Sequence, residues 1–208
     1  MDRLVSGTIM SLVTIASMQF SSMFTVLKVC VSLAAASEFY NLANISSKKR
    51  ARYGLGQCGH PSYLLNILTV IVPSVFLYKS IVLSNNDLAF IFSIVWASDT
   101  AGLVVGRLAS RYFEIQKLTE WSPKKTVHGL FGALFCGTLC GLLYKNDFSI
   151  DIVLRCFVLA SISQIGDFLE SVIKRHCGIK DSNYLFYIPG HGGILDRIDG
   201  LIFAVVCY

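Results

Sequence analysis

Residues 88–106 read LAFIFSIVWASDTAGLVVG, an apolar run in which Asp99 is the only charged side chain. A helix that crosses a bilayer needs about 20 such residues, so this run predicts a membrane span. A charge at the centre of a span costs roughly 2.5–3.5 kcal/mol, so Asp99 needs a partner or a purpose. Gly102 and Gly106 are spaced for close helix packing, which accounts for the glycines but leaves the aspartate unexplained.

Further apolar runs lie near 4–20, 22–42, 63–83, 126–144 and 150–171, and a shorter one covers Ile198–Tyr208. The chain is 54% hydrophobic and 15% charged, against roughly 25% charged residues in soluble domains. We therefore expect an all-α, polytopic transmembrane helical bundle of about six to seven membrane helices. It should form a single domain over 1–208, with N-terminal spans in 1–85 and the motif-bearing part in 86–208.

Basic residues gather in alternate connections between the runs. They are Lys48, Lys49, Arg50 and Arg52, then Arg107, Arg111, Lys117, Lys124 and Lys125, then Lys174, Arg175, Lys180 and Arg197. The other connections hold one lysine at most, so the positive-inside rule places the N-terminus and the basic loops in the cytoplasm. Cys58 and Cys177 are expected in these cytoplasmic loops. The N-terminal segment is read as a retained helix, because it shows no convincing cleavage pattern.

Residues 164–199 read QIGDFLESVIKRHCGIKDSNYLFYIPGHGGILDRID, a polar stretch between apolar segments. On a helix, Asp167, Glu170, Ser171 and Lys174 share one face, because residues three and four apart are neighbours. A solvated helix end with an internal Glu–Lys pair is the plain alternative. Carboxylates at membrane depth are costly and usually functional, which favours a site.

The turn Pro189-Gly190-His191-Gly192-Gly193 and the following Asp196 and Asp199 form the second half of this stretch. Glycines let a backbone approach a phosphate closely and expose its N–H groups. If the segment after the turn is helical, the two aspartates face the same way. Such carboxylates suit Mg²⁺, which usually takes one or two of them together with substrate phosphates.

Residues 122–126, Ser-Pro-Lys-Lys-Thr, lie at the entrance to the run near 126–144. Lys124 and Lys125 can hold phosphate oxygens, and Ser122 can cap the helix with Pro123 in its first turn. Two lysines taken alone favour simple positive-inside topology.

The combined pattern resembles the signature of the phosphatidate cytidylyltransferase (CDP-diacylglycerol synthase) family. The resemblance rests on Ser171-x-x-Lys174-Arg175-x-x-x-x-Lys180-Asp181, followed by Pro189-Gly190-His191-Gly192-Gly193-x-x-Asp196-Arg197-x-Asp199. Gln164-x-Gly166-Asp167-x-x-Glu170, the 122–126 loop, Asp99-Thr100 with Gly106-Arg107, and Glu38 before Phe39-Tyr40 also resemble it. The chain departs from the family at Val127-His128, where a Trp-Glu pair is typical, and in a longer link over Ser182–Ile188.

The resemblance implies transfer of CMP from CTP to phosphatidic acid, giving CDP-diacylglycerol and pyrophosphate. It implies catalytic roles for Lys174, Arg175, Lys180, Asp181, His191 and Arg197, and substrate contacts from Asp99, Ser122, Lys124, Lys125, Thr126, Ser171, Gly190, Gly192 and Gly193. Asp167, Asp196 and Asp199 are expected to bind Mg²⁺, with a monovalent cation as a further candidate. The expected partners are CTP, phosphatidic acid and membrane lipid, without nucleic acid. The glycine spacing is compatible with a homodimer. The expected location is a bacterial inner membrane, with the site facing the cytoplasm.

Two other classes stay open. A CTP-dependent polyprenol or phytol kinase would use related chemistry, although the full string is not expected there. A non-catalytic membrane paralogue or a transporter would not need every charged residue of the signature. CDP-alcohol phosphotransferases fit less well, because their Asp-Gly-x-x-Ala-Arg motif is absent after Asp199-Gly200.

Overall fold

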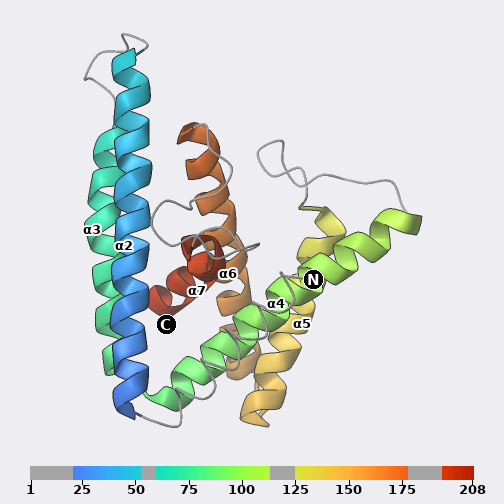
Figure 1. The fold of residues 1–208 in the computed structure, drawn as a ribbon. Coiled ribbons are helices and arrows are strands. Elements are labelled where there is room, and N and C mark those ends of the chain that lie inside the picture. Colours follow the sequence, from blue (N-terminus) through green and yellow to red (C-terminus); the bar gives the residue numbers. More distant parts are fainter. Residues whose placement is uncertain (1–20, 53–59, 113–124, 178–193) are drawn as a thin grey trace. The chain divides into compact units, whose positions relative to one another are not determined.

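The computed structural model describes residues 21–52, 60–112, 125–177 and 194–208, and these are almost entirely helical (Figure 1). The helices are α2 (Ser21–Arg52), α3 (His60–Val82), α4 (Asn85–Tyr112), α5 (Val127–Lys145), α6 (Ile150–Cys177) and α7 (Leu195–Cys207). The all-α class expected from the apolar runs is confirmed.

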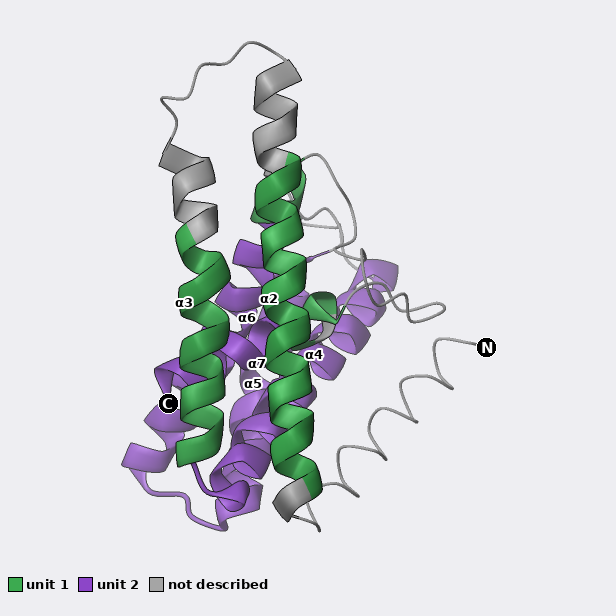
Figure 2. Ribbon diagram, turned by 60° about the vertical axis from the view of Figure 1, so that its left-hand side comes forward, with its two compact units in different colours: residues 1–82, 173–198 green, residues 83–172, 199–208 purple. Residues whose placement is uncertain are grey.

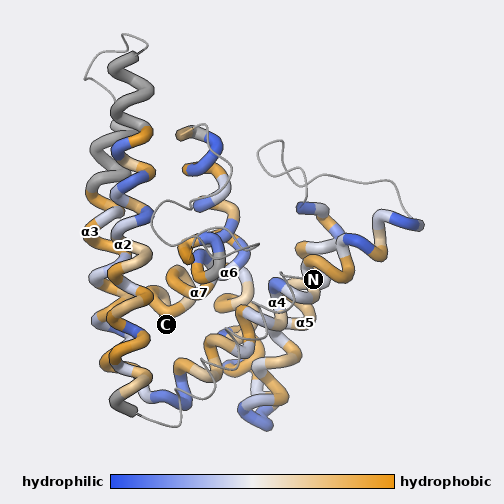
Figure 3. The backbone as a smooth tube through the Cα atoms, viewed as in Figure 1, coloured by the Kyte–Doolittle hydropathy of each residue, from blue (hydrophilic) through white to orange (hydrophobic). Residues whose placement is uncertain are grey.

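Four helical segments within the described residues are long and apolar enough to cross a membrane: Met23–Ile45, Asn85–Tyr112, Val127–Lys145 and Ile150–Arg175. Two shorter apolar helices cover Ile67–Val82 and Ile198–Cys207. Figure 3 shows the apolar stretches of these helices, with polar residues gathered toward the helix ends and in the C-terminal half of α6. The expected run at 4–20 lies outside the described residues.

The chain divides into two compact units (Figure 2). Unit 1 comprises residues 1–82 and 173–198, and unit 2 comprises 83–172 and 199–208. The divisions fall inside α6 and α7, so each of these helices contributes to both units. The expectation of a single domain with parts 1–85 and 86–208 stays a prediction.

In unit 1, α2 and α3 lie side by side (Figures 1 and 2). Small residues of α2, Ala34 and Ala35, are buried along it. The buried Ser32 hydroxyl donates a 2.8 Å hydrogen bond to the carbonyl oxygen of Pro73 in α3. Because a hydroxyl at membrane depth has no water to bond, this pairing ties α2 to α3.

In unit 2, glycines bring α4 and α5 into close contact. A Cβ atom on Gly129 would lie 2.8 Å from the carbonyl oxygen of Gly102, and one on Gly106 would lie 3.0 Å from the Thr126 hydroxyl. Only hydrogen fits at Gly129, so the two backbones approach closely there. The packing role expected for Gly102 and Gly106 is confirmed, and the contact lies within the chain. The homodimer stays a prediction.

The N-terminal ends of α4 and α5 are capped by side chains of the residues that immediately precede them. The Ser84 hydroxyl accepts from the backbone N–H of Asp87 at 3.1 Å, and Thr126 accepts from that of Gly129 at 3.0 Å. Such caps pair backbone N–H groups that have no partner inside the helix. The expectation that Ser122 caps the second of these helices is wrong, because α5 begins after Thr126.

Several residues expected in loops are helical. Lys48–Arg52 belong to α2, Arg107 and Arg111 to α4, and Lys174, Arg175 and Cys177 to α6. Cys177 is buried at the end of α6, and its Sγ donates to the Leu42 carbonyl oxygen at 3.5 Å, so the expectation that it lies in a loop is wrong. A helix satisfies its own backbone hydrogen bonds, so it continues past the apolar run into polar sequence.

Candidate active site

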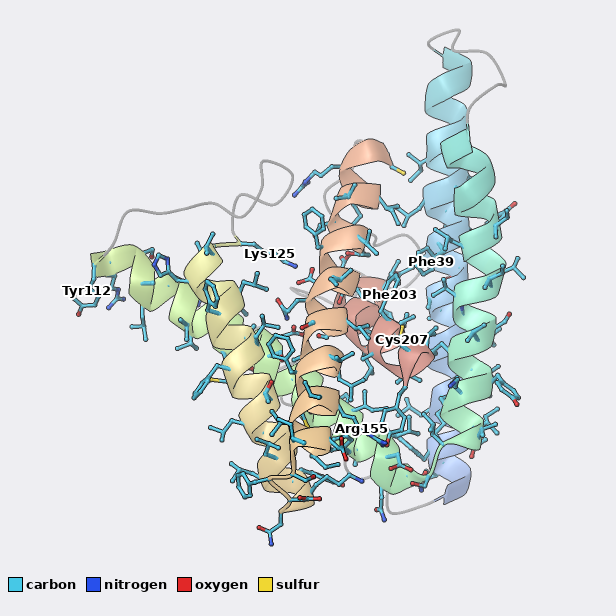
Figure 4. All side chains as sticks on the ribbon, turned by 180° about the vertical axis from the view of Figure 1, so that it is seen from behind. Phe39, Tyr112, Lys125, Arg155, Phe203 and Cys207 are labelled. Carbon is cyan, nitrogen blue, oxygen red and sulfur yellow. The ribbon has the colours of Figure 1, made fainter. Side chains whose placement is uncertain are left out.

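Lys125 lies just before α5, and Asp167 lies within α6. The Lys125 Nζ is 2.7 Å from an Asp167 carboxylate oxygen, and both side chains are only partly exposed. Figure 4 shows the Lys125 side chain extending from the start of α5 toward α6. The Thr126 cap and the Gly129 contact fix the start of α5, so the lysine leaves from a constrained backbone.

Asp99 finds its partner on α6. Gln164 Nε2 donates a 3.0 Å hydrogen bond to Asp99 Oδ1. An amide partner satisfies one lone pair of the carboxylate but brings no opposite charge of its own. The expectation that Asp99 needs a partner is therefore met by a neutral side chain, which favours a role for its charge.

Asp199 is the one signature aspartate that is buried among those the structure describes, with 8% of its surface exposed. It lies in the first part of α7, a 13-residue helix that is too short to span a bilayer. Burial raises the pKa of its carboxyl group well above the ordinary value, and the nearby charges of Asp167, Glu170 and Asp99 raise the same pKa further. The backbone N–H of Gly200 donates to Asp199 at 2.7 Å and opposes the shift in part.

We define the carboxylate cluster as Asp99, Asp167, Glu170 and Asp199, all in unit 2. Glu170 is 2% exposed on α6, one helical turn after Asp167. Lys125 is bonded to this cluster through Asp167. Four carboxylates thus gather in one enclosed region, and opposite charges nearby favour their ionised form.

The donor chemistry of the cluster fits a hard divalent cation such as Mg²⁺, which prefers carboxylate oxygens. No group of three or more His, Cys, Asp or Glu side chains is spaced to hold a metal ion in the part of the chain that the structure describes. The expected set is divided, with Asp167 and Asp199 in unit 2 and Asp196 in unit 1. Magnesium binding stays a prediction.

In unit 1, Lys174 near the end of α6 meets Asp196 in the first turn of α7. The Nζ donates to Oδ1 at 2.7 Å, and each side chain is 12% exposed. The resemblance assigned both residues to the site but did not indicate that they pair. The plain alternative of an internal Glu–Lys pair did not indicate this contact between α6 and α7.

Other expected site residues are only partly described. Ser171 is half-buried on α6, Arg175 is exposed near its end, Thr126 caps α5, and Arg197 belongs to α7. Outside the described residues lie Ser122, Lys124, Lys180, Asp181, Gly190, His191, Gly192 and Gly193. Their expected contacts with substrate stay predictions.

Sequence reasoning left Glu38, Gln164 and Glu170 out of the expected site. Glu38 is fully buried on α2, and its two carboxylate oxygens accept the backbone N–H groups of Ile194 and Leu195, both at 2.9 Å. A glutamate inside an apolar run was a usable signal, because a charge at membrane depth needs a partner. The partner could not be predicted, because Glu38 and the start of α7 are far apart in the sequence.

The chain is similar in sequence to known proteins. The cytidylyltransferase family matches residues 57–208. Phosphatidate cytidylyltransferase of Staphylococcus aureus (strain COL) is 35% identical over 150 residues, which is 68% of this chain and 55% of the relative. The proteins of that name from Staphylococcus epidermidis and Staphylococcus saprophyticus are 36% identical over the same shares.

The chain spans about half the length of these relatives. The family match extends from 57 to the end of the 208-residue sequence and includes the carboxylate cluster, Lys125 and the Lys174–Asp196 pair. It therefore covers most of the chain and nearly all of the candidate site, with Glu38 outside it. On this match, the chain belongs to the cytidylyltransferase family.

Proposed function

We propose that the chain is a phosphatidate cytidylyltransferase, which transfers CMP from CTP to phosphatidic acid. Family membership and the names of the relatives support this proposal. The observation that carries it is the Lys125–Asp167 ion pair beside the buried Asp199, because this is where the chain concentrates opposite charges. A reaction between two phosphates needs positive charge to bind them and carboxylates to hold the accompanying metal ion.

The proposed reaction joins two anions. An oxygen of the phosphatidate phosphate monoester attacks the α-phosphorus of CTP, and a new P–O bond forms. The bond from that phosphorus to the bridging oxygen of the β-phosphate breaks, and pyrophosphate leaves with the electron pair. The attacking oxygen is already ionised near pH 7, since the second pKa of a phosphate monoester is about 6. No strong general base is therefore required, and the barrier is mainly electrostatic.

We propose that Lys125 and Lys174 each help to lower that barrier. Each ammonium group is held at 2.7 Å from an aspartate, Lys125 by Asp167 and Lys174 by Asp196. In the absence of substrate, the carboxylates orient these charges. We infer that triphosphate oxygens compete with the carboxylates for the lysines when CTP binds, and that the ammonium groups then stabilise the charge on the leaving pyrophosphate.

The carboxylate cluster would repel a triphosphate unless cations accompanied it. We propose that Asp167 and Asp199 hold Mg²⁺, because acidic oxygens suit this ion. Asp196 as a further ligand follows from the family resemblance alone. When bound, Mg²⁺ would neutralise phosphate charge and polarise the reacting P–O bonds. Asp99 and Gln164 would hold the cluster in place from the α4 side through their 3.0 Å hydrogen bond.

We further propose that the site faces the cytoplasm of a bacterial inner membrane. In unit 2 the C-terminal end of α4 carries Arg107 and Arg111, and Lys125 lies at the start of α5. The opposite helix ends carry Asp87, Asp147 and Asp151 around a single lysine, Lys145. This asymmetry follows the positive-inside rule. Labelling of single cysteines at positions 111 and 147 from either side of sealed vesicles tests the assignment.

The test of the function is a reaction with purified protein, CTP labelled at the α-phosphate, and phosphatidic acid in mixed micelles. Labelled CDP-diacylglycerol and an equal amount of pyrophosphate are expected, and chelation of Mg²⁺ should abolish both. Release of CDP, with label absent from lipid, would instead indicate a CTP-dependent kinase. Polyprenol should be offered in a parallel reaction. No product from either acceptor would overturn the enzyme assignment.

A further inference from the structure

The start of α7 is held by a side chain from another helix. Glu38 of α2 accepts the backbone N–H groups of Ile194 and Leu195 through its two carboxylate oxygens, both at 2.9 Å. Ile194 immediately precedes α7, and Leu195 is its first residue. Backbone N–H groups at this position have no partner within the helix, so the carboxylate acts as an N-terminal cap supplied from a distance.

The local sequence explains why this cap comes from elsewhere. Ser84 and Thr126 begin α4 and α5 with their own hydroxyl groups. At the corresponding place before α7, Ile194 has no polar side-chain atom and Gly193 has no side chain. The chain thus lacks a local side-chain acceptor just before Asp196, and Glu38 supplies one.

The charge of Glu38 suits this position. It is fully buried, whereas a buried carboxylate is normally avoided in an apolar helix. The N-terminus of a helix carries partial positive charge, and hydrogen bonds from N–H groups to an ionised acceptor are strong. Two such bonds fix both the position and the direction in which α7 begins.

The next residue along α7 is Asp196, which receives the Lys174 ammonium at 2.7 Å. Glu38, Lys174 and Asp196 belong to the same unit. A shift of the α7 start would move Asp196 relative to α6, and a displacement of about 1 Å can lower a rate roughly 100-fold. We propose that Glu38 is a positioning residue for nucleotidyl transfer, which holds the Asp196 end of α7 against Lys174. This inference rests on the proposed function.

The test compares Glu38→Gln with Ser32→Ala, both on α2. The glutamine keeps the size of the side chain but loses the charge and one acceptor. Ser32→Ala removes a buried hydrogen bond between α2 and α3, to the Pro73 carbonyl, and leaves α7 alone. It therefore controls for general loosening of α2. Hydrogen exchange at the amides of Ile194 and Leu195 reports the cap directly, without any need for activity.

For Glu38→Gln we expect exchange at Ile194 and Leu195 to accelerate about 10-fold or more, and kcat for CDP-diacylglycerol formation to fall roughly 10- to 100-fold. The KM for CTP should change much less than kcat, because the contacts that bind CTP remain. Ser32→Ala should keep the wild-type kcat and exchange at both amides, whatever its melting temperature.

Unchanged exchange in Glu38→Gln would overturn the cap. Faster exchange with wild-type kcat would overturn the positioning role, as would an equal loss of kcat in Ser32→Ala. A wild-type protein that makes no CDP-diacylglycerol would overturn the proposed function instead, and with it any role of Glu38 in that reaction. The exchange rates would still decide whether Glu38 holds α7.

Discussion

The two ends of α5 each carry a lysine paired with an aspartate, yet their surroundings differ. Lys125 lies 2.7 Å from Asp167, and Lys145 lies 3.6 Å from Asp87. Asp87 also accepts hydrogen bonds from Ser84 at 2.6 Å and from Tyr208 at 3.2 Å. The Lys145 ammonium lies 4.8 Å from the centre of the Phe90 ring. Both members of this pair thus have neutral partners as well.

At the Lys125 end, by contrast, further carboxylates surround the pair. Glu170 and Asp199 are buried nearby, and their charges act on one another. The fractional exposures of the two lysines, 21% for Lys125 and 35% for Lys145, do not by themselves separate the two ends. The difference lies in the balance of charge. At the Lys145 end the paired aspartate has neutral hydrogen-bond partners, whereas at the Lys125 end the paired aspartate has buried acidic neighbours.

The largest expected effect comes from removing one charge at each end. Asp199→Asn should lower kcat/KM for CDP-diacylglycerol formation by roughly 100-fold or more, because a group that stabilises the transition state is lost. Asp87→Asn should stay within about twofold of wild type. The melting temperature in detergent should not fall in Asp199→Asn, since a buried charge among like charges is removed. Similar losses in both variants would show that the ends do not differ.

Truncating the lysines is expected to have the next largest effect. Lys125→Ala should lower kcat/KM for CTP about 10- to 100-fold, the range for loss of one hydrogen bond between charged groups. Lys145→Ala is the matched control on the same helix and should be nearly silent. Lys125→Arg should keep part of the activity, because the charge remains while its shape changes. Steady-state kinetics would measure all three variants. If Lys125→Ala were as active as Lys145→Ala, Lys125 would have no role in catalysis.

Moving the Lys125 end without touching its charges sharpens the comparison further. Gly129→Ala places a methyl group 2.8 Å from the Gly102 carbonyl, whereas Gly102→Ala places one at an ordinary 3.5 Å from its nearest neighbours. The first should destabilise unit 2 by about 1–3 kcal/mol and lower activity, since overpacking shifts backbones. The second should be tolerated. Thermal unfolding and turnover are measured for both variants. If Gly129→Ala left both the melting temperature and the turnover unchanged, the close α4–α5 packing would be contradicted.

The smallest effect is expected at the Lys145 end. Ser84→Ala removes the cap of α4, with an expected loss of about 1 kcal/mol of stability. Turnover at a temperature where the protein stays folded should be that of wild type. A large loss of turnover in this variant would mean that the Lys145 end of α5 takes part in catalysis, which contradicts the proposed site.

The apolar runs were sufficient to predict most helices, because hydrophobic length at membrane depth allows little else. The same reasoning could not place helix ends. Lys48–Arg52 and Cys177 continue their helices, since a helix pairs its own backbone groups whether its side chains are apolar or not. The cap of α5 was assigned to Ser122 instead of Thr126, because both residues have a suitable hydroxyl and spacing alone does not distinguish them.

The site was partly predictable for a different reason. Motif residues such as Asp99, Asp167 and Asp199 were identified by type and spacing along the chain. Which of them meet depends on contacts between helices that no local spacing encodes. The pairing of Lys125 with Asp167 and the cap from Glu38 to α7 are contacts of this kind. Glu38 was noted in the family resemblance and as a charge in an apolar segment, but neither indicated its partner.

The contrast between the two ends can be measured without substitution. An amine-reactive probe applied to the purified protein, followed by mass spectrometry, reports the accessibility of Lys125 and Lys145 in one experiment. With CTP and Mg²⁺ present, labelling of Lys125 should fall severalfold while that of Lys145 stays constant. Protection of Lys145 instead, or no protection of Lys125 under conditions where CDP-diacylglycerol forms, would contradict a nucleotide site at the Lys125 end of α5.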